Sequence, residues 1–392
     1  IWACFGDDSL PVTFPGPTID MRYGEPCFLR IHNQLPPLAT HTGWGIPQLN
    51  QHLHNFHSAS ESDGGPWEWY SPGEFHDHHW TLMRAGFTVP DTIPGQWRDQ
   101  FGGDKRESLN TLFLHNHRPE FTAANVYKGL VQFVRIFDEM DTGNENSGQG
   151  WRLPSGEFDV PLLLADKQFD PFTGEMIFDP FNTDGFLGDK ATVNGKVQPY
   201  FEVKRRKYRF RILNGGPSRT VTIVLRHNGV NTPFVKIADN GNFIETPATF
   251  TSHEVWTAER HDFIVDFSQF NDGDNVHLCN IMPQIFGAKP ERGSVLNPDA
   301  VENQMLEFRV RGPLVQDQSQ IPSFFRPLPP IDLTEVVRTR VWEFERKNGS
   351  WTVNGQAWDP DLDHRLSELL NPRTQVRRNT AERWILSNKS GG

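Results

Sequence analysis

The chain has little cysteine and no long hydrophobic run. Its three cysteines, Cys4, Cys27 and Cys279, are too few for a disulfide framework and allow at most one bridge. The strand-like surroundings of Cys27 and Cys279 predict buried side chains that act as small hydrophobes. Because no run of roughly 18 apolar residues occurs, the sequence predicts no membrane-spanning segment.

An excess of positive charge is also missing. The chain has 38 Lys and Arg against 49 Asp and Glu, a formal net charge of -11. This balance lacks the basic footprint of a nucleic-acid binder, so we expect no nucleic-acid partner. The chain begins at Ile1 and carries no signal-peptide pattern. We interpret this start as that of a processed protein or an excerpted piece, and expect a secreted or extracellular location.

Long helical periodicity is absent as well. Instead, 30 Pro and 33 Gly separate many short runs rich in Val, Ile, Phe and Thr. This pattern predicts an all-β protein. A length of 392 residues exceeds one ordinary domain and predicts two or three.

A threefold repeat supports that estimate. Residues 17–33, 199–214 and 372–388 each read as a strand, a polar turn, a second strand and an asparagine. The second and third copies are both preceded by Thr-Val-Asn-Gly, at 192–195 and 352–355. We therefore predict one β-sandwich unit that occurs three times.

The repeat and the linkers set the predicted domains at 1–150, 151–312 and 313–392. A polar linker at 141–150 ends the first, and a proline-rich connector at 321–330 leads into the third. The third domain contains only its opening strands. It cannot close a sandwich alone, because it would leave an open edge and an uncovered face.

Two His-x-His pairs point to a metal site. Residues 111–117 read as a buried strand, in which alternation places His115 and His117 on one face. His52 and His54 flank an apolar residue in the same way. Imidazole suits copper, zinc, iron or nickel. The four histidines are therefore predicted to converge on metal.

Two other charged clusters are predicted to have no such role. His76, His78 and His79 follow a Ser-Pro-Gly sequence and read as part of an exposed loop. The basic run from Lys204 to Lys207 reads as a solvated turn.

Taken together, the repeat, the histidine pairs and several short motifs resemble the three-domain multicopper oxidases. The resemblance is closest to the spore-coat laccases and the bilirubin oxidase and phenoxazinone synthase group. It implies tandem cupredoxin-like Greek-key β-sandwich domains, two complete and the third partial. The short motifs lie at 14–19, 61–64, 125–130, 210–215 and 265–268.

The resemblance also implies a role for each candidate site residue. His52 would bind the type 2 copper, and His54, His115 and His117 would bind the type 3 pair. Asp63 would assist proton delivery, which suits a carboxylate near a cluster that makes water. An equal alternative makes Asp63 a turn residue in Ser-Asp-Gly. The type 1 copper ligands and the other cluster ligands are absent from this chain and would follow it.

The implied function is that of the N-terminal portion of a laccase-like multicopper oxidase. Such an enzyme couples one-electron oxidation of phenolic, aromatic-amine or tetrapyrrole donors to reduction of O2 to water. This chain would supply half of the trinuclear copper site. Its partners would be O2, a small aromatic reducing substrate and a C-terminal companion segment that completes domain 3.

Two alternatives stay open. The chain could be a non-catalytic cupredoxin scaffold with a structural or binding role, since fold alone does not prove activity. Alternatively, the two histidine pairs could hold a single zinc or copper ion in a hydrolytic or storage role.

Overall fold

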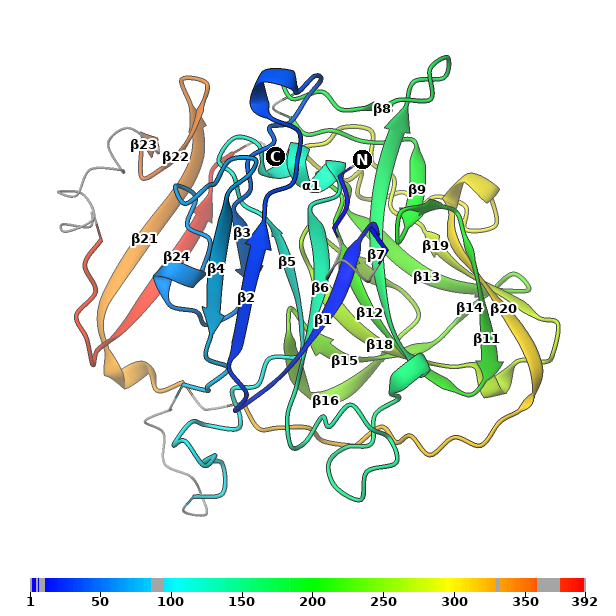
Figure 1. The fold of residues 1–392 in the computed structure, drawn as a ribbon. Helices are drawn as coiled ribbons and strands as arrows, with labels where there is room; N and C mark the ends of the chain where they lie inside the picture. The colour runs from blue at the N-terminus through cyan, green and yellow to red at the C-terminus, as the bar shows by residue number, and fades with distance from the viewer. Residues whose placement is uncertain are drawn as a thin grey trace. The chain divides into compact units, whose positions relative to one another are not determined.

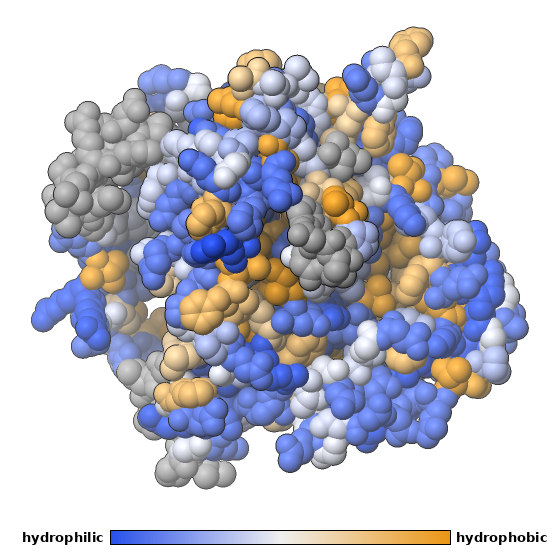
Figure 2. All heavy atoms as spheres, in the orientation of Figure 1, coloured by the Kyte–Doolittle hydropathy of each residue, from blue (hydrophilic) through white to orange (hydrophobic). Residues whose placement is uncertain are grey.

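The computed structural model describes residues 2–4, 6, 11–85, 95–182, 184–328, 331–357 and 374–390. The chain divides into two compact units, Ile1–Leu328 and Pro329–Gly392. On the face shown in Figure 2, hydrophilic side chains predominate and hydrophobic ones are scattered between them. In the described part of the chain, no helix is both long enough and apolar enough to cross a bilayer.

The larger unit contains two β-sandwiches in series (Figure 1). The first combines the four-stranded sheet β1-β6-β5-β3 with the two-stranded sheet β2-β4. Alternate side chains of these strands point inward and form the buried core of the first sandwich. Among them are Leu53, Trp80, Leu112, Leu114 and Val134. Its strands are β1 (Gly16–Arg22), β2 (Cys27–His32), β3 (Gln51–His54), β4 (Phe75–Trp80), β5 (Thr111–Asn116) and β6 (Val131–Phe137).

Strand β4 corrects one prediction. The segment with His76, His78 and His79 is not an exposed loop but a strand that pairs antiparallel with β2. Its alternation buries His78 and Trp80 against the core of the first sandwich. The prediction was wrong because the partner strand β2 is distant in sequence, so local polarity gave no sign of the pairing.

The second sandwich is larger. Its first sheet has the order β10-β9-β7-β12-β18-β15-β16, and its second has the order β11-β20-β19-β13-β14. The largest hydrophobic core, which includes Phe210, Phe263, Phe267 and Phe308, belongs to this sandwich. Its strands are β7 (Asp159–Phe169), β8 (Met176–Ile177), β9 (Lys190–Val193), β10 (Lys196–Val197), β11 (Tyr200–Arg205), β12 (Lys207–Asn214), β13 (Val221–His227), β14 (Val230–Thr232), β15 (Phe234–Asp239), β16 (Asn242–Phe250), β17 (His253–Val255), β18 (Arg260–Asp266), β19 (Asn275–Asn280) and β20 (Gln304–Leu314).

Helical structure is short in the described part of the chain. The α-helix α1 (Thr122–Lys128) ends at Gly129, whose φ is 134°. A Cβ there would lie 2.0 Å from the carbonyl oxygen of Trp2, so the position requires glycine. The 3-10 helices are η1 (Leu38–Thr40), η2 (Ser60–Ser62), η3 (Gly156–Phe158), η4 (Phe267–Gln269), η5 (Val301–Asn303) and η6 (Leu333–Glu335).

The described residues of the smaller unit form one four-stranded sheet of order β23-β22-β21-β24. This order repeats that of β10-β9-β7-β12 in the second sandwich, with the same parallel pairing of the two long strands. Its strands are β21 (Val336–Lys347), β22 (Ser350–Val353), β23 (Gln356–Ala357) and β24 (Ala381–Asn388).

The repeated Thr-Val-Asn-Gly motif forms the same hairpin in both units. Asn194 and Gly195 connect β9 to β10, and Asn354 and Gly355 connect β22 to β23. All four residues have positive φ, between 49° and 78°, as in a type I′ turn. In the third repeat, residues 371–373 lie outside the described residues, and residues 374–380 form no strand.

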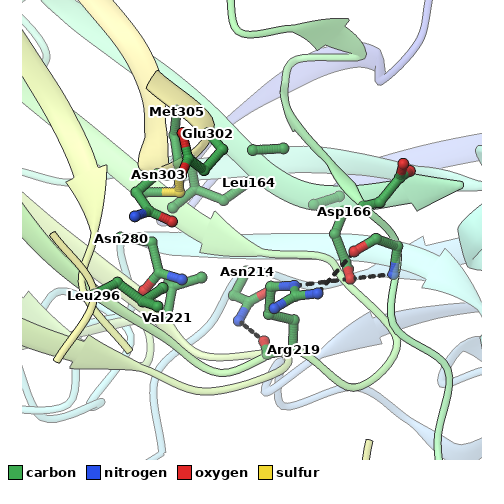
Figure 3. A pocket seen from close by; sticks show the side chains of 14 residues that line it. Leu164, Asp166, Asn214, Arg219, Val221, Asn280, Leu296, Glu302, Asn303 and Met305 are labelled. Atoms are coloured by element: carbon green, nitrogen blue, oxygen red, sulfur yellow. Dashed lines mark hydrogen bonds and ion pairs between the residues drawn. The ribbon is translucent and has the colours of Figure 1, made fainter. Parts of the chain in front are cut away.

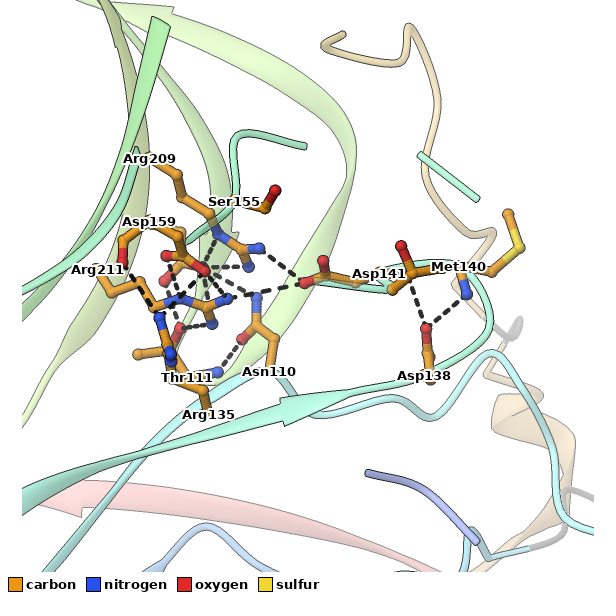
Figure 4. A network of polar contacts seen from close by, with 12 residues as sticks. Asn110, Thr111, Arg135, Asp138, Met140, Asp141, Ser155, Asp159, Arg209 and Arg211 are labelled. Carbon is orange, nitrogen blue, oxygen red and sulfur yellow. Dashed lines mark hydrogen bonds and ion pairs between the residues drawn. The ribbon is translucent and has the colours of Figure 1, made fainter. Parts of the chain in front are cut away.

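A buried ionic network joins the elements at the junction of the two sandwiches (Figure 4). Arg209 and Arg211 lie side by side on β12 and are fully buried. Arg209 donates to Asp262 at 2.6 Å and to Asp141 at 2.7 Å. Arg211 donates to Asp159 at 2.7 Å. Since every charge has an opposite partner, the desolvation cost of burial is offset.

A second group of buried ion pairs corrects the prediction for the basic run. Arg206 is only 3% exposed and pairs with Glu145 at 2.7 Å and with Asp317 at 3.0 Å. The prediction of a fully solvated basic turn was therefore wrong for Arg206. Asp141 and Glu145, in the predicted linker, are buried by their arginine partners. The domain boundaries at 150 and 312 stay predictions.

Candidate metal centre

The four predicted histidines lie together on the outer face of the β3 and β5 pair. His52 stands opposite His115 in the antiparallel register, while the neighbouring Leu53 and Leu114 point into the core. One ligand nitrogen from each of His52, His54 and His115 lies within 4.8 Å of the others. The ring of His117 lies 4.8 Å from that of His52, measured between centroids.

Backbone carbonyls set the protonation of three rings. His52 Nδ1 lies 2.6 Å from the carbonyl of Asp63, His115 Nδ1 lies 2.9 Å from that of Asn116, and His117 Nδ1 lies 3.2 Å from that of Gly64. A carbonyl oxygen can only accept, so each Nδ1 carries the proton. In the neutral form of each ring, Nε2 then carries the lone pair that can bind metal, and in His115 this lone pair faces His54 Nδ1.

The fourth ring faces its neighbour directly. His54 Nδ1 lies 3.2 Å from His115 Nε2. Burial, with the nearby charge of Arg260, lowers the pKa of His54 to about 4. Burial also lowers the pKa of His115 well below its usual range and lowers that of His117. Neutral imidazoles at pH 7 need no proton loss before they bind a metal ion.

Two supporting residues were missed by the sequence analysis. Phe113 stacks on His54 at 4.7 Å and on His115 at 4.8 Å, with interplanar angles of 22° and 21°. Strand alternation could have found Phe113, because it shares a face with His115. Arg260 reaches the site from β18 of the second sandwich and donates to Asn55, the residue after His54. No local signal points to it.

Asp63 lies beside the centre. Its carbonyl accepts from His52, and its carboxylate Oδ1 lies 3.6 Å from His52 Nδ1. Ser58 Oγ donates to the same carboxylate at 2.9 Å. Asp63 also follows η2, where it is the C-terminal residue of a turn. Its position therefore suits both predicted roles.

The remaining histidines and the cysteines have other surroundings. His57 pairs with Glu107 at 2.6 Å, and His78 bonds to the carbonyl of Ser62. All three cysteines are free. Cys279 is fully buried as predicted, whereas Cys27 is only partly buried, so that prediction was wrong for its degree of burial.

A separate cavity of about 140 Å³ lies in the second sandwich (Figure 3). Asp166 anchors one wall and accepts from Arg219 Nε at 2.9 Å. Among the described residues that line it, none is a histidine or cysteine. The possible metal donors in its lining are carboxylate and amide oxygens with the single thioether of Met305, so the cavity lacks the imidazole set of the histidine centre.

The chain is similar to several known proteins, although no family model matches it. It is 28% identical over 354 residues to a laccase of Bacillus subtilis (strain 168), which covers 83% of this chain and 62% of that protein. It is 31% identical over 324 residues to a bilirubin oxidase of Albifimbria verrucaria, with 80% and 52% covered.

Solved structures agree with these relatives. The McoA multicopper oxidase of the hyperthermophile Aquifex aeolicus matches 87% of this chain with a TM-score of 0.68 and 26% identity, over 64% of that chain. CueO, a laccase-like multicopper oxidase of Ochrobactrum sp., matches 96% of this chain and 73% of its own, with a TM-score of 0.70 and 20% identity. These likenesses confirm the predicted all-β, cupredoxin-like fold.

The chain spans 52–62% of the length of the laccase and bilirubin oxidase relatives described above. The likeness nevertheless covers most of the chain in sequence and in structure, and it agrees with the grouping of the four histidines. The chain is therefore similar to laccase-like multicopper oxidases in sequence and in fold over most of its own length.

Proposed function

We propose that this chain forms part of a laccase-like multicopper oxidase and holds copper at its four histidines. One observation carries the proposal: three of the rings donate Nδ1 protons to backbone carbonyls, which leaves Nε2 lone pairs available beside His54. Neutral imidazole donors suit copper. Copper, when bound, supplies one-electron redox chemistry, which the protein supports by fixing the geometry of its ligands.

The individual assignments are part of the proposal. His52 binds the type 2 copper, and His54, His115 and His117 bind the type 3 pair. The remaining cluster ligands and the type 1 ligands come from sequence outside these 392 residues. The oxidised donors are phenols, aromatic amines or tetrapyrroles, O2 is reduced to water, and the protein is secreted.

Exposed apolar side chains in the smaller unit favour the proposal of a companion segment. Its single described sheet exposes large apolar side chains, among them Leu386 at 69%, Trp351 at 57% and Trp384 at 50% exposed. A sheet with apolar side chains open to water needs a covering layer. We propose that the segment with the missing ligands supplies this layer.

Asp63 is proposed to deliver protons. Its carboxylate lies beside His52 and accepts from Ser58, so it can take up a proton at the edge of the centre. We expect Asp63→Asn to lower O2 reduction at least tenfold and to shift the acid limb of the pH profile, with copper content unchanged. O2 uptake across pH, recorded after addition of the segment that carries the type 1 ligands, measures this effect. An unchanged profile would leave Asp63 as a turn residue.

Copper loading of the purified chain tests the metal site. We expect the chain to bind Cu(I) with an affinity that falls at least tenfold in His54→Gln and His115→Gln. His57→Gln is the matched control, because His57 pairs with Glu107 outside the centre. Chelator competition gives the affinity.

Oxidase activity is a separate readout. We expect O2 uptake with a phenolic donor only after addition of a segment that carries the type 1 ligands. Copper affinity that stays the same when the four histidines are replaced would contradict the proposal and favour a non-catalytic scaffold. One tightly held Zn2+ with hydrolytic activity would favour the single-metal alternative.

A further inference from the structure

Arg260 links the second sandwich to the candidate metal centre of the first. It lies at the start of β18 and is only 2% exposed. Its Nη2 donates to Asn55 Oδ1 at 2.6 Å and to the carbonyl of Asn240 at 3.0 Å. Its Nη1 donates to the carbonyl of Ala258 at 2.8 Å, and its Nε to that of Thr111 at 3.4 Å.

These partners make Arg260 unusual among the buried arginines. Arg209 and Arg211 pair with carboxylates, as ionic burial requires. Among the described residues, no carboxylate forms an ion pair with Arg260. Its acceptors are carbonyl and amide oxygens instead. Arg260 is therefore held by directed hydrogen bonds to several elements, with Asp262, Asp239 and Glu259 attracting its charge from farther away.

The contacts of Arg260 converge on the metal-binding histidines. Asn55 directly follows His54 and has a φ of 68°, so its hydrogen bond to Arg260 fixes the backbone where the ligand strand ends. The guanidinium also lies 5.3 Å from the ring centroid of Phe113, which stacks on both His54 and His115. Arg260 thus touches the two residues that hold these rings.

We propose that Arg260 is a positioning residue, which holds Asn55 and Phe113 so that His54 and His115 keep the geometry that copper needs. This inference rests on the proposed function and adds a role for the second sandwich, which contributes no ligand itself. Arginine suits the task because its planar fork can donate in several fixed directions, whereas lysine is a flexible point charge.

Copper affinity of the full 392-residue chain tests the proposal, with Cu(I) as the probe and a chromogenic chelator as competitor. We expect Arg260→Gln to weaken copper binding at least tenfold, the usual effect of losing a residue that supports metal ligands. Arg260→Lys should recover only part of the loss. The Cu(II) EPR spectrum should change in both variants, because the ligand geometry changes.

Asn55→Gly isolates the hydrogen bond. Glycine accepts the positive φ of this position without strain, and loss of the side chain removes the Oδ1 that accepts from Arg260. We expect it to weaken copper binding less than Arg260→Gln. In the double variant the two losses should not add, because Arg260 acts in part through Asn55.

Arg206→Gln is the matched control, since Arg206 is equally buried but pairs with Glu145 and Asp317, away from the histidines. The Arg206→Gln variant should unfold at a lower urea concentration, with its copper affinity and its EPR spectrum unchanged. Should Arg260→Gln fail to fold, Arg260→Lys and Asn55→Gly carry the test.

Wild-type affinity and an unchanged EPR spectrum in the folded Arg260 and Asn55 variants would overturn the inference. An equal loss of copper binding in Arg206→Gln would overturn it too, since a general loss of stability would then explain the effect. If the wild-type chain bound no copper, or bound it as tightly as His54→Gln does, the proposed function would be refuted instead. The two failures are therefore distinguishable.

Discussion

At the scale of single residues, the candidate centre depends on a turn as much as on its ligands. The carbonyls of Asp63 and Gly64, consecutive in the chain, orient His52 and His117. A small shift of this turn moves two ring nitrogens at once. The turn is therefore as sensitive a target for mutation as the histidines themselves.

Gly64→Ala should damage both stability and the metal site. Gly64 has a φ of 74°, and a Cβ there would lie 2.3 Å from the carbonyl oxygen of Gln51. We expect a loss of about 2–4 kcal/mol in the free energy of unfolding, from backbone strain and steric clash. Copper affinity should fall as well, because the turn must shift. Urea unfolding and chelator competition measure the two effects.

Gly73→Ala is the matched control. Gly73 has a φ of 90°, but a Cβ there would meet no atom within 4 Å. Only the cost of the left-handed conformation remains, about 1–2 kcal/mol, and copper affinity should be unchanged. Equal losses of affinity in the two variants would contradict the role of the turn at Gly64.

His78 should make the protein sensitive to acid. Burial lowers the pKa of His78 from its usual 6.5 to about 4. The unfolded chain therefore takes up a proton first, so stability is full above pH 6.5 and is lost as pH falls toward 4. The loss from this group is about 3 kcal/mol at most. Urea unfolding of the metal-free chain across pH measures it.

His78→Phe should remove that part of the acid sensitivity. The carbonyl of Ser62, which accepts from His78, also accepts from Trp80 Nε1 at 3.1 Å, so the variant leaves no buried carbonyl unpaired. The variant keeps an aromatic ring against Trp80. An identical pH dependence in wild type and variant would show that His78 does not carry the effect.

At the scale of elements, strand β5 is held from both sides. Within its sheet it pairs with β6 along one edge and with β3 along the other, and Thr111 Oγ1 also donates to Asp262 on β18 of the second sandwich at 2.7 Å. Asp262 also accepts from Arg209 on β12. The strand that carries His115 is therefore anchored to the sheet of the second sandwich by a buried charge.

Asp262→Asn should destabilise the protein strongly. The change leaves Arg209 with one fewer carboxylate in a fully buried site, which costs about 3–5 kcal/mol. Asp299→Asn is the control, since Asp299 pairs with Arg226 at 2.6 Å at an exposed site and should cost under about 1 kcal/mol. Urea unfolding compares them. Similar losses in both would mean that the network contributes little.

At the scale of the whole molecule, all predicted site residues lie in the larger unit. His52, His54, Asp63, His115 and His117 all precede the boundary at residue 328, as does Arg260, which only the structure brought to the site. That unit has its own hydrophobic cores, described above. It therefore contains what folding and the histidine centre require.

We expect residues 1–328 to fold alone and to bind Cu(I) through the histidines within about threefold of the full chain, a difference of about 0.7 kcal/mol. Circular dichroism, urea unfolding and chelator competition check this expectation, with His54→Gln in the same fragment as control. An unfolded fragment, or one that has lost histidine-dependent copper binding, would show that the smaller unit is required.

Local patterns were enough to predict much of this protein. The period-2 alternation of a strand predicted that His115 and His117 share one face, and the Thr-Val-Asn-Gly sequences at 192–195 and 352–355 supported the repeat, which the structure shows as the same hairpin in both units. The histidine pairs and the repeat pointed to the family. These features depend on neighbours within a few residues, which a sequence displays directly.

Only tertiary structure decided how those pieces meet. The pairing of β3 with β5 brings the two histidine pairs together, and the pairing of β2 with β4 buries His78. Arg206 is buried and Arg260 reaches Asn55 because strands remote in sequence pack against each other. Contacts of this kind depend on the register and packing of whole sheets, and a polar residue looks the same in sequence whether its partner is water or a buried strand.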